Sequence, residues 1–386
     1  MNVELTENKL ADIENHIQEN YIKSGRFSCG ATLYYHNGRV INGSLLGLMD
    51  VERNKPVSQD TIFRIYSMTK PITSVGFMRL YELGLVSLDD PVHKFIPSWK
   101  DLIVYQSGNL NNFFGVPPSE PMTIKHLLTH QSGLTYGLMS DTKVDQAYRT
   151  LINFADPNAG TLEDLIELLS NLPLVFSPGS AWNYSLSTDV LGYLISVISD
   201  MDFDDYLKKY IFDPLGMIDT DFYVPQEKID RFAANYVSGP SNYTSEKNFS
   251  ESEGLRLLDD PMASIYSTKP SYLSGGGGLV STLDDYMNFS RMLLNKGSFG
   301  DAFILNPETI ELMTQNHIPE NKDLTNFAME GIRWAESSFA DVGFGLGFST
   351  QTADTSEGSK GQYGWGGAAS TYFWIDPHID LICIFM

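Results

Sequence analysis

Cysteine is almost absent from this chain, which has only Cys29 and Cys383 among its 386 residues. Its first 21 residues also lack the continuous apolar stretch that a secretion signal needs. A framework of disulfides is therefore not expected, and we interpret both cysteines as small core residues of strands. Together these absences predict a cytoplasmic protein.

Basic residues and long apolar runs are scarce as well. Lys and Arg together number 26 against 48 Asp and Glu, which gives a net charge of −22 at pH 7. Such a charge disfavours binding to nucleic acid and to anionic membrane surfaces. No segment approaches the ~20 consecutive apolar residues of a membrane-spanning helix. We therefore predict a small-molecule substrate and neither a nucleic-acid nor a membrane partner, and the oligomeric state stays open.

Three familiar site signatures are missing or incomplete. No Gly-x-Ser-x-Gly occurs, so the nucleophile turn of an α/β-hydrolase is not expected. His126 and His130 lie four residues apart without the Glu of His-Glu-x-x-His, which favours buried hydrogen-bonding histidines over a metal site. The glycines at 275–278 lack the Gly-Lys-Ser/Thr of a phosphate loop, so they indicate close backbone packing. We predict no metal and no cofactor.

The segment 63–83 carries the clearest signal in what remains. Its apolar residues lie on most faces of a helix, which indicates a buried helix, and Pro71 fits the first turn. Ser67 and Lys70 are three residues apart, so they point the same way at the helix start. We expect the positive end of the helix to lower the pKa of Lys70. A neutral amine there could take the proton of the serine hydroxyl.

The Ser-x-x-Lys pattern is short, and it occurs a second time at Ser140 to Lys143. That copy follows a glycine-containing loop and has acidic neighbours, so we interpret it as a solvated loop entering a surface helix. For Ser67 the competing interpretation is an N-cap serine followed by a surface lysine. The structural context of the motif decides between the two.

Strand patterns occupy both ends of the sequence, and helical patterns occupy its middle. The expected strands are 28–35, 40–48, 343–350, 362–365, 370–375 and 381–386. The expected helices are 1–21, 123–129, 162–172, 187–199, 203–211 and 283–295, with 225–272 interpreted as loops. We predict an α+β fold with an antiparallel sheet built from both termini and flanked by helices. In this prediction 1–90 plus 266–386 form the sheet domain, 91–265 an inserted, mostly helical lobe, and the active site lies in the cleft between them.

Two further stretches could face such a cleft. Tyr184 lies in a polar turn directly before a helix, where a neighbouring cationic lysine would lower its pKa and let the phenolate act as a base. The alternative is a hydrogen-bonded tyrosine at a loop–helix junction. The strand 364–368, Gly-Trp-Gly-Gly-Ala, has little side chain, which indicates that another backbone or a ligand comes close to it.

Five stretches in order resemble the serine β-lactamase and penicillin-binding-protein superfamily, and most closely its class C-type esterase branch, the family VIII carboxylesterases. They are FRIYSMTKPIT, TIKHLLTHQSGL, FSPGSAWNYS, SGGGGLVSTLDDY, and GFGLGF followed by YGWGGAAS. The resemblance extends over most of the chain. It implies a β-lactamase/transpeptidase-like fold and chemistry through an acyl-enzyme.

The resemblance also implies roles for particular residues. Ser67 is the expected nucleophile, Lys70 its partner, and Tyr184 the general base and later the proton donor to the leaving group. The backbone N–H groups of Ser67 and Ala368 are the expected oxyanion hole. The substrate-binding residues expected around them are Trp365, Gly366, Gly367, Tyr136 and Leu186.

The sequence departs from the β-lactamase pattern in three places. Trp365 and Gly366 stand where β-lactamases present lysine and threonine, and Leu186 stands where they present asparagine. Without a cationic anchor and an amide, neutral esters are favoured over β-lactams. The family also continues past the last strand into a final helix, whereas this sequence ends at Met386, so the expectation is either a fragment or a sheet face covered in another way.

These features together predict a serine hydrolase that cleaves short-chain carboxylic esters. An amidase, a D-amino-acid peptidase, a weak β-lactamase or a transesterase could use the same groups. A binding or sensor protein that is acylated without turnover is the non-enzymatic alternative. We expect aromatic residues of the loops to shape an apolar pocket, namely Phe113, Phe114, Tyr136, Tyr243 and Tyr272.

Overall fold

An antiparallel sheet, formed by strands from both ends of the chain, lies at the centre of the molecule. The computed structural model describes residues 6–110, 112–152, 158, 160–238, 254–332, 340–356 and 358–386. Within these residues the sheet has eight strands in the order β12-β13-β14-β15-β16-β1-β2-β3. The strands are β1 (Cys29–His36), β2 (Arg39–Asp50), β3 (Lys55–Pro56), β12 (Val342–Phe344), β13 (Ser349–Gln351), β14 (Tyr363–Gly366), β15 (Tyr372–Asp376) and β16 (Leu381–Phe385). The predicted fold class is confirmed.

Pairing of β1 with β16 joins the two groups of strands. Leu33 lies opposite Ile384, and Tyr34 lies opposite Cys383. Successive side chains of a strand point to opposite faces, so Leu33 and Ile384 enter the main core while Tyr34 and Cys383 form a smaller cluster on the other face. Cys29 and Cys383 are free thiols in strands, as predicted.

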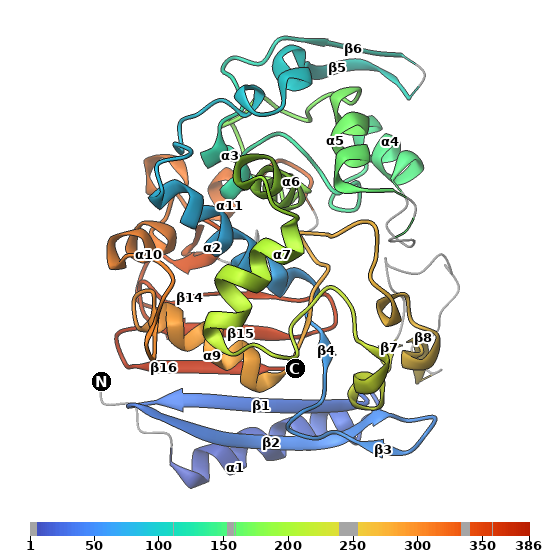
Figure 1. Cartoon of the computed structure of the whole chain (residues 1–386), viewed down its shortest axis with the longest axis vertical. Helices are drawn as coiled ribbons and strands as arrows, with labels where there is room; N and C mark the ends of the chain where they lie inside the picture. The colour runs from blue at the N-terminus through green and yellow to red at the C-terminus, as the bar shows by residue number, and fades with distance from the viewer. Residues whose placement is uncertain are drawn as a thin grey trace.

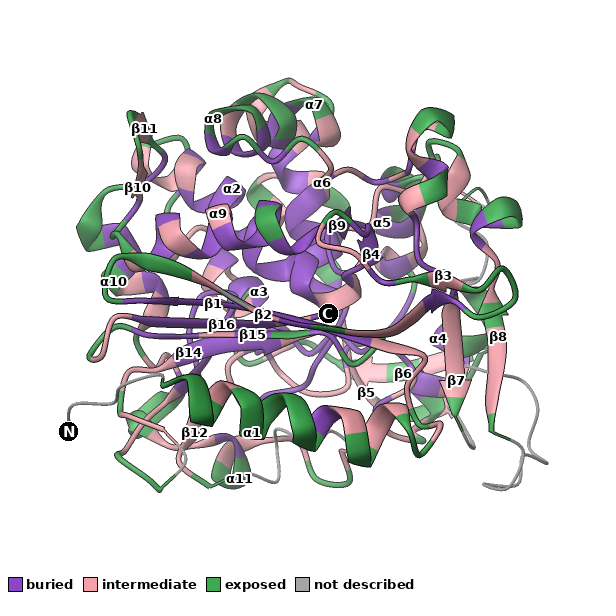
Figure 2. Ribbon diagram, turned by 90° about the horizontal axis from the view of Figure 1, so that it is seen from below, coloured by how far each residue is buried: buried purple, intermediate pink, exposed green. Residues whose placement is uncertain are grey.

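Helices cover both faces of the sheet. Figure 2 shows α1 (Glu7–Ile17) on one side and α2 (Thr69–Glu82) and α9 (Leu283–Leu294) on the other. Helix α1 is amphipathic as predicted, because Leu10 packs on the smaller cluster and Ile17 is buried while most of its other residues are exposed. Helix α2 is buried on nearly every side, which confirms the expectation for segment 63–83.

The middle of the chain forms further helices, most of which lie above α2 in Figure 1. They are α3 (Ile124–Leu128), α4 (Lys143–Leu151), α5 (Leu162–Ser170), α6 (Ser187–Ser199), α7 (Phe203–Leu207) and α8 (Asp213–Leu215). Two more, α10 (Pro307–Thr314) and α11 (Leu324–Phe327), follow α9. The expected helices after residue 100 are confirmed within about one turn of their predicted ends. The helix expected at 1–21 begins at Glu7, and the first five of its predicted residues lie outside the described residues. The boundaries of an inserted lobe at 91 and 265 stay a prediction.

Two expectations about the strands were wrong, and one hairpin was not expected. The middle of the chain contains two hairpins, and part of 225–272 is therefore strand and not loop: β5 (Val104–Asn109), β6 (Asn112–Val116), β7 (Asn235–Ser238) and β8 (Leu255–Asp259). These strands are at most partly buried, so their sequences lack the alternation of a half-buried strand. The expected strand 343–350 is two strands, because Gly347 takes φ +102° in a turn between β12 and β13.

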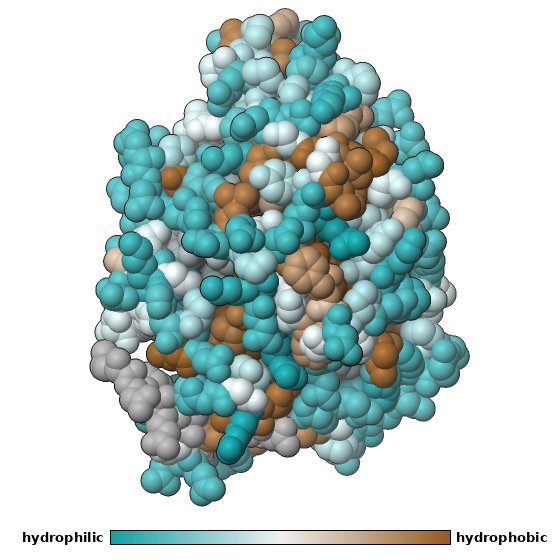
Figure 3. All heavy atoms as spheres, turned by 60° about the vertical axis from the view of Figure 1, so that its left-hand side comes forward, coloured by the Kyte–Doolittle hydropathy of each residue, from teal (hydrophilic) through white to brown (hydrophobic). Residues whose placement is uncertain are grey.

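The outer surface is mainly polar. The face in Figure 3 is largely hydrophilic, with apolar side chains in groups separated by polar ones, in keeping with the net charge of −22. Within the described residues, no helix combines the length and apolar character needed to cross a membrane.

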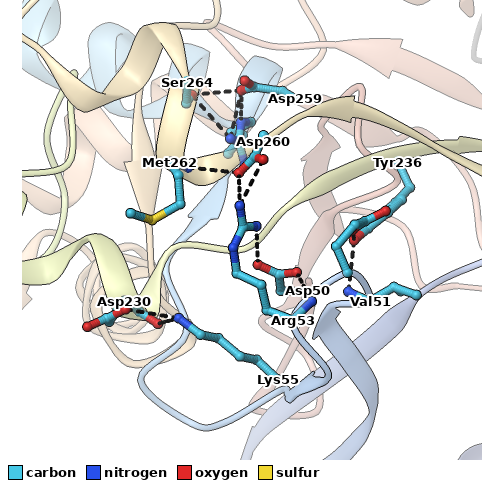
Figure 4. Close-up of polar contacts among 12 residues, drawn as sticks. Asp50, Val51, Arg53, Lys55, Asp230, Tyr236, Asp259, Asp260, Met262 and Ser264 are labelled. Atoms are coloured by element: carbon cyan, nitrogen blue, oxygen red, sulfur yellow. Dashed lines mark hydrogen bonds and ion pairs between the residues drawn. The ribbon is translucent and has the colours of Figure 1, made fainter.

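Two arginines bind the end of β8 and the residues that follow it. Arg53 binds Asp50 and Asp260 at 2.8 Å each, as Figure 4 shows. Arg64, in the short strand β4 (Phe63–Arg64), is buried and binds Asp259 at 2.7 Å and the Ser264 hydroxyl at 3.2 Å. Because β4 leads into the helix that begins after Ser67, these contacts fix the segment after β8 relative to that helix.

We expect Arg64→Ala to lower the free energy of unfolding by about 3–5 kcal/mol, because it removes one partner of a buried ion pair. Urea unfolding followed by circular dichroism would measure the change. Lys208→Ala is the matched control, since Lys208 pairs with Asp213 where both side chains are more than half exposed. The control should change stability by less than about 1 kcal/mol. Equal effects of both substitutions would contradict a stabilising role for the buried contacts of Arg64.

Candidate active site

Ser67 lies in a turn of 3₁₀-helix, Tyr66–Met68, which runs directly into α2. Tyr66 takes φ +41°. This left-handed conformation is uncommon for a bulky residue and is typical of strain at functional positions. It places the residue before the serine on the cavity wall, together with Ser67 itself. The sequence gives no sign of this conformation.

Lys70 is the nearest basic group to the serine. Its Nζ lies 3.2 Å from Ser67 Oγ and donates a hydrogen bond of 2.5 Å to the carbonyl oxygen of Gly276. Only 1% of Lys70 is exposed. The structure thus rules out the competing interpretation of a surface lysine, and it brings Ser67 and Lys70 together as predicted.

The second Ser-x-x-Lys copy forms no such pair. Ser140 donates its hydroxyl hydrogen bond to Asp145, while Lys143 is exposed and bonds Gln146 at 3.0 Å. Thr142 caps α4 by accepting from the Asp145 N–H. This copy is the start of a surface helix, as predicted.

Burial lowers the pKa of Lys70 to about 7, and the negative charge of Asp189 opposes this shift. The cause differs from the expectation, which assigned the lowered pKa to the positive end of the helix. A buried ammonium loses its hydration, and this loss favours the neutral amine. Near neutral pH a substantial fraction of Lys70 can therefore accept a proton.

Tyr184 faces Lys70 from the turn before α6. Its ring centroid lies 4.5 Å from Lys70 Nζ, and its hydroxyl oxygen accepts a 3.3 Å hydrogen bond from Trp365 Nε1. Tyr184 and Trp365 are both at most 2% exposed. The tyrosine therefore lies at the same centre as the serine–lysine pair, as predicted.

A buried chain of hydroxyl groups fixes this turn. Ser185 Oγ lies 3.1 Å from His130 Nδ1 and 2.9 Å from Ser187 Oγ, which in turn lies 2.8 Å from Ser132 Oγ. The His130 ring packs on Tyr184 with centroids 4.9 Å apart. Burial holds the pKa of His130 well below its usual value, so this histidine is neutral. Its role in packing agrees with the prediction, and no group of three metal-ligating side chains occurs among the residues that the structure describes.

The glycine-rich strand β14 comes close to other backbone, as its sequence predicted. A side chain at Gly367 would meet the carbonyl oxygen of Ile65 at 2.4 Å, and one at Gly364 would meet that of Phe373 at 2.2 Å. The end of β14 therefore lies against the residues just before Ser67, and this contact brings Ala368 to the cavity that Ser67 lines. The glycines at 275–278 are also packed closely, because a side chain at Gly275 would meet the Thr188 carbonyl at 2.6 Å.

A mainly apolar cavity of about 250 Å³ opens at Ser67. Its wall consists of Tyr66, Ser67, Tyr136, Leu138, Met139, Tyr184, Phe222, Ile265, Tyr266, Pro270, Tyr272, Ser274, Gly276, Gly277, Gly278 and Ala368. Segments far apart in the sequence meet here, and several of these residues (Phe222, Ile265 and Tyr266 among them) carry no local motif that could have identified them.

The expected substrate-binding residues divide into two groups. Tyr136 lines the cavity, whereas Trp365, Gly366, Gly367 and Leu186 are not part of the wall formed by the described residues. Leu186 is buried at the start of α6, and Trp365 reaches the site through Tyr184. Of the loop aromatics, Tyr136 and Tyr272 line the cavity, Phe113 and Phe114 lie on the β5–β6 hairpin away from it, and Tyr243 lies outside the described residues.

Comparison with known proteins identifies enzymes among those to which this chain is similar. Esterase EstB of Burkholderia gladioli is 29% identical over 272 residues, which cover 69% of this chain and 65% of EstB. The solved structure of EstCE1, a hydrolase with promiscuous acyltransferase activity, has a TM-score of 0.77 at 26% identity and covers 98% of this chain and 93% of its own.

A third relative and a family model extend over nearly the whole sequence. Protein Rv1367c of Mycobacterium tuberculosis (strain ATCC 25618 / H37Rv) is 31% identical over 371 residues, which are 94% of this chain and 86% of that protein. The model of the Beta-lactamase family matches residues 13–386. Hydrolytic and acyl-transfer enzymes thus occur among the relatives, and the chain belongs to the Beta-lactamase family.

Proposed function

We propose that this protein is a serine hydrolase that cleaves short-chain carboxylic esters through an acyl-enzyme. The observation that carries the proposal is the 3.2 Å contact between Ser67 Oγ and a buried lysine, at the mouth of an apolar cavity. A serine hydroxyl becomes a nucleophile when an adjacent group can take its proton. The similarity to the esterase EstB and to the hydrolase EstCE1 supports this choice of reaction.

In this mechanism Ser67 Oγ attacks the ester carbonyl while its proton passes to the neutral amine of Lys70. The backbone N–H groups of Ser67 and Ala368 donate to the developing oxyanion. The carbon–oxygen bond to the alcohol then breaks, Tyr184 donates the proton that the alcohol needs, and Lys70 returns a proton to Tyr184. Water completes the cycle by the reverse path and releases the acid.

Transfer of the acyl group to an alcohol is a second candidate function. It would use the same groups, with an alcohol in place of water in the second step. The acyltransferase activity named for EstCE1 supports acyl transfer as a candidate function of this protein. The ratio of acid to new ester formed in the presence of an added alcohol distinguishes the two outcomes.

We expect wild-type protein to release p-nitrophenol steadily from p-nitrophenyl butyrate, and Ser67→Ala to lose roughly a thousandfold or more of this activity. Ser140→Ala is the matched control, because Ser140 belongs to the other Ser-x-x-Lys copy, and it should keep the wild-type rate. Equal rates for wild type and Ser67→Ala would refute the mechanism. A stoichiometric burst without steady turnover would indicate an acylated binding protein instead.

We expect a strong preference for uncharged acyl groups. No Lys or Arg is part of the wall among the described residues. Lys70, which contacts Ser67, is buried and partly neutral, and Arg64, which lies over the Tyr266 ring, is paired with Asp259. Mono-p-nitrophenyl succinate matches the butyrate ester in length and adds a carboxylate, whose desolvation no cation offsets. Its kcat/KM should be at least about tenfold lower than that of the butyrate. Comparable values for the two esters would contradict the proposed substrate class.

The dependence of kcat/KM on pH should reflect the protonation of Lys70. Because neutral Lys70 is the proposed base and its pKa is about 7, kcat/KM should rise as the pH increases through about 7. Deprotonation of His130 does not account for such a rise, which we call the acid limb, since the pKa of His130 lies well below the usual histidine value. Steady-state rates in constant-ionic-strength buffers would test this expectation, and a profile that is flat between about pH 6 and 8 would exclude Lys70 as the base.

A further inference from the structure

Asp189 is a buried carboxylate that the mechanism above does not use. It lies in the first turn of α6, five residues after Tyr184, and is 1% exposed. Its Oδ1 accepts hydrogen bonds from Tyr272 Oη at 2.9 Å, Ser274 Oγ at 2.6 Å and Gly276 N at 3.1 Å. Its Oδ2 is buried and has no hydrogen-bond partner in the described part of the chain. A buried charge of this kind is costly unless other groups compensate it.

Gly276 connects this carboxylate to the lysine. Its N–H donates to Asp189 Oδ1, and its carbonyl oxygen accepts from Lys70 Nζ. A side chain at this position would meet Asp189 Oδ2 at 2.4 Å and the Tyr136 hydroxyl at 2.6 Å, so only glycine fits. Asp189 thereby holds the carbonyl group that directs the amine of Lys70 toward Ser67.

The other groups around Lys70 carry no full charge at neutral pH. The turn before α6 contributes the ring of Tyr184. The loop after α3 contributes Tyr136, whose ring centroid lies 5.2 Å from Nζ, and neutral His130. Tyr272, in the segment after β8, contacts Asp189, and burial raises its pKa well above the usual value, so it is also uncharged. Among the described groups that face Lys70, Asp189 is therefore the one that supplies a compensating negative charge.

We propose that Asp189 is a positioning residue for Lys70, which fixes the Gly276 carbonyl and stabilises the ammonium that forms when Lys70 takes the Ser67 proton. This inference rests on the proposed function. In that step the Ser67 O–H bond breaks, an N–H bond forms on Nζ, and the oxygen electron pair forms the bond to the ester carbon. The new positive charge arises in a site without bulk water, where the carboxylate is worth more than it would be in water.

Asp189→Asn tests the charge while it keeps the shape. An amide oxygen can still accept from Tyr272, Ser274 and Gly276, so the loop stays in place. Without the negative charge the pKa of Lys70 falls, and the acid limb of kcat/KM should move to lower pH by about half a unit or more. The plateau should fall about tenfold or more, because the ammonium is less stable and the amine a weaker base. A purely structural role would lower the plateau and leave the limb where it is.

Asp376→Asn is the matched control, since Asp376 is also buried and accepts from the His378 N–H at the far end of β15. It should leave limb and plateau unchanged. Ser274→Ala removes one donor from Asp189 and leaves more of its charge uncompensated, so the limb should move to higher pH. This opposite shift tests the proposal even if Asp189→Asn does not fold.

Ser67→Ala in the same assay separates the two hypotheses. Retained activity in Ser67→Ala would overturn the proposed function and this inference with it. Loss of activity in Ser67→Ala, together with a limb that moves in neither Asp189→Asn nor Ser274→Ala, would overturn the inference alone. Opposite shifts in the two Asp189-directed variants, with an unmoved limb in Asp376→Asn, would establish it.

Discussion

The burial of one amine is the constraint on which the site depends. Lys70 lies on a helix that is enclosed on nearly every side, between the sheet and α6, so no surface is available through which its side chain could reach water. Two consequences follow from this position. The amine is partly neutral near pH 7, and its N–H groups need acceptors inside the protein, which Gly276 provides. The close packing of the glycine segment against α6 makes that acceptor available.

The same burial opposes folding. The pKa of Lys70 falls from 10.5 to about 7 in the folded chain, so the unfolded chain binds more protons between these two pH values. The contribution of Lys70 to stability is therefore unfavourable at neutral pH and becomes less so as the pH rises through this window. Strain at Tyr66 adds to this cost at the adjacent position. The β1–β16 pairing and the buried contacts of Arg64 do not involve the reacting groups. They contribute stability that offsets the burial of Lys70 and the strain at Tyr66.

Features that depend on neighbours in the sequence could be predicted, and those that depend on distant neighbours could not. The strands at both ends and the Ser67 to Lys70 pair follow from periodicity and spacing. Asp189 escaped notice because an acidic residue in the first turn of a helix usually serves the helix itself, and its three donors come from residues more than eighty positions away. The cause of the Lys70 pKa shift was misjudged for the same reason, since burial is a property of the assembled core. The hairpins β5–β6 and β7–β8 lack a buried face, so their sequences carried no alternation to detect.

The departure at Trp365 acquires a physical meaning from these charges. β-Lactamases, which this chain resembles, present a lysine at this place. A second cation beside Lys70 and Tyr184 would depress the pKa of Lys70 further and would bind a substrate carboxylate. Here an indole N–H, donated to the Tyr184 hydroxyl, occupies the position and orients the tyrosine without adding charge. With Asp189 as the nearest full charge, the site is then nearly neutral when Lys70 is protonated and negative when it is not. Such a site repels an anionic substrate in the state in which Lys70 can act as a base. The absence of the second lysine and the predicted preference for neutral esters therefore have the same electrostatic cause.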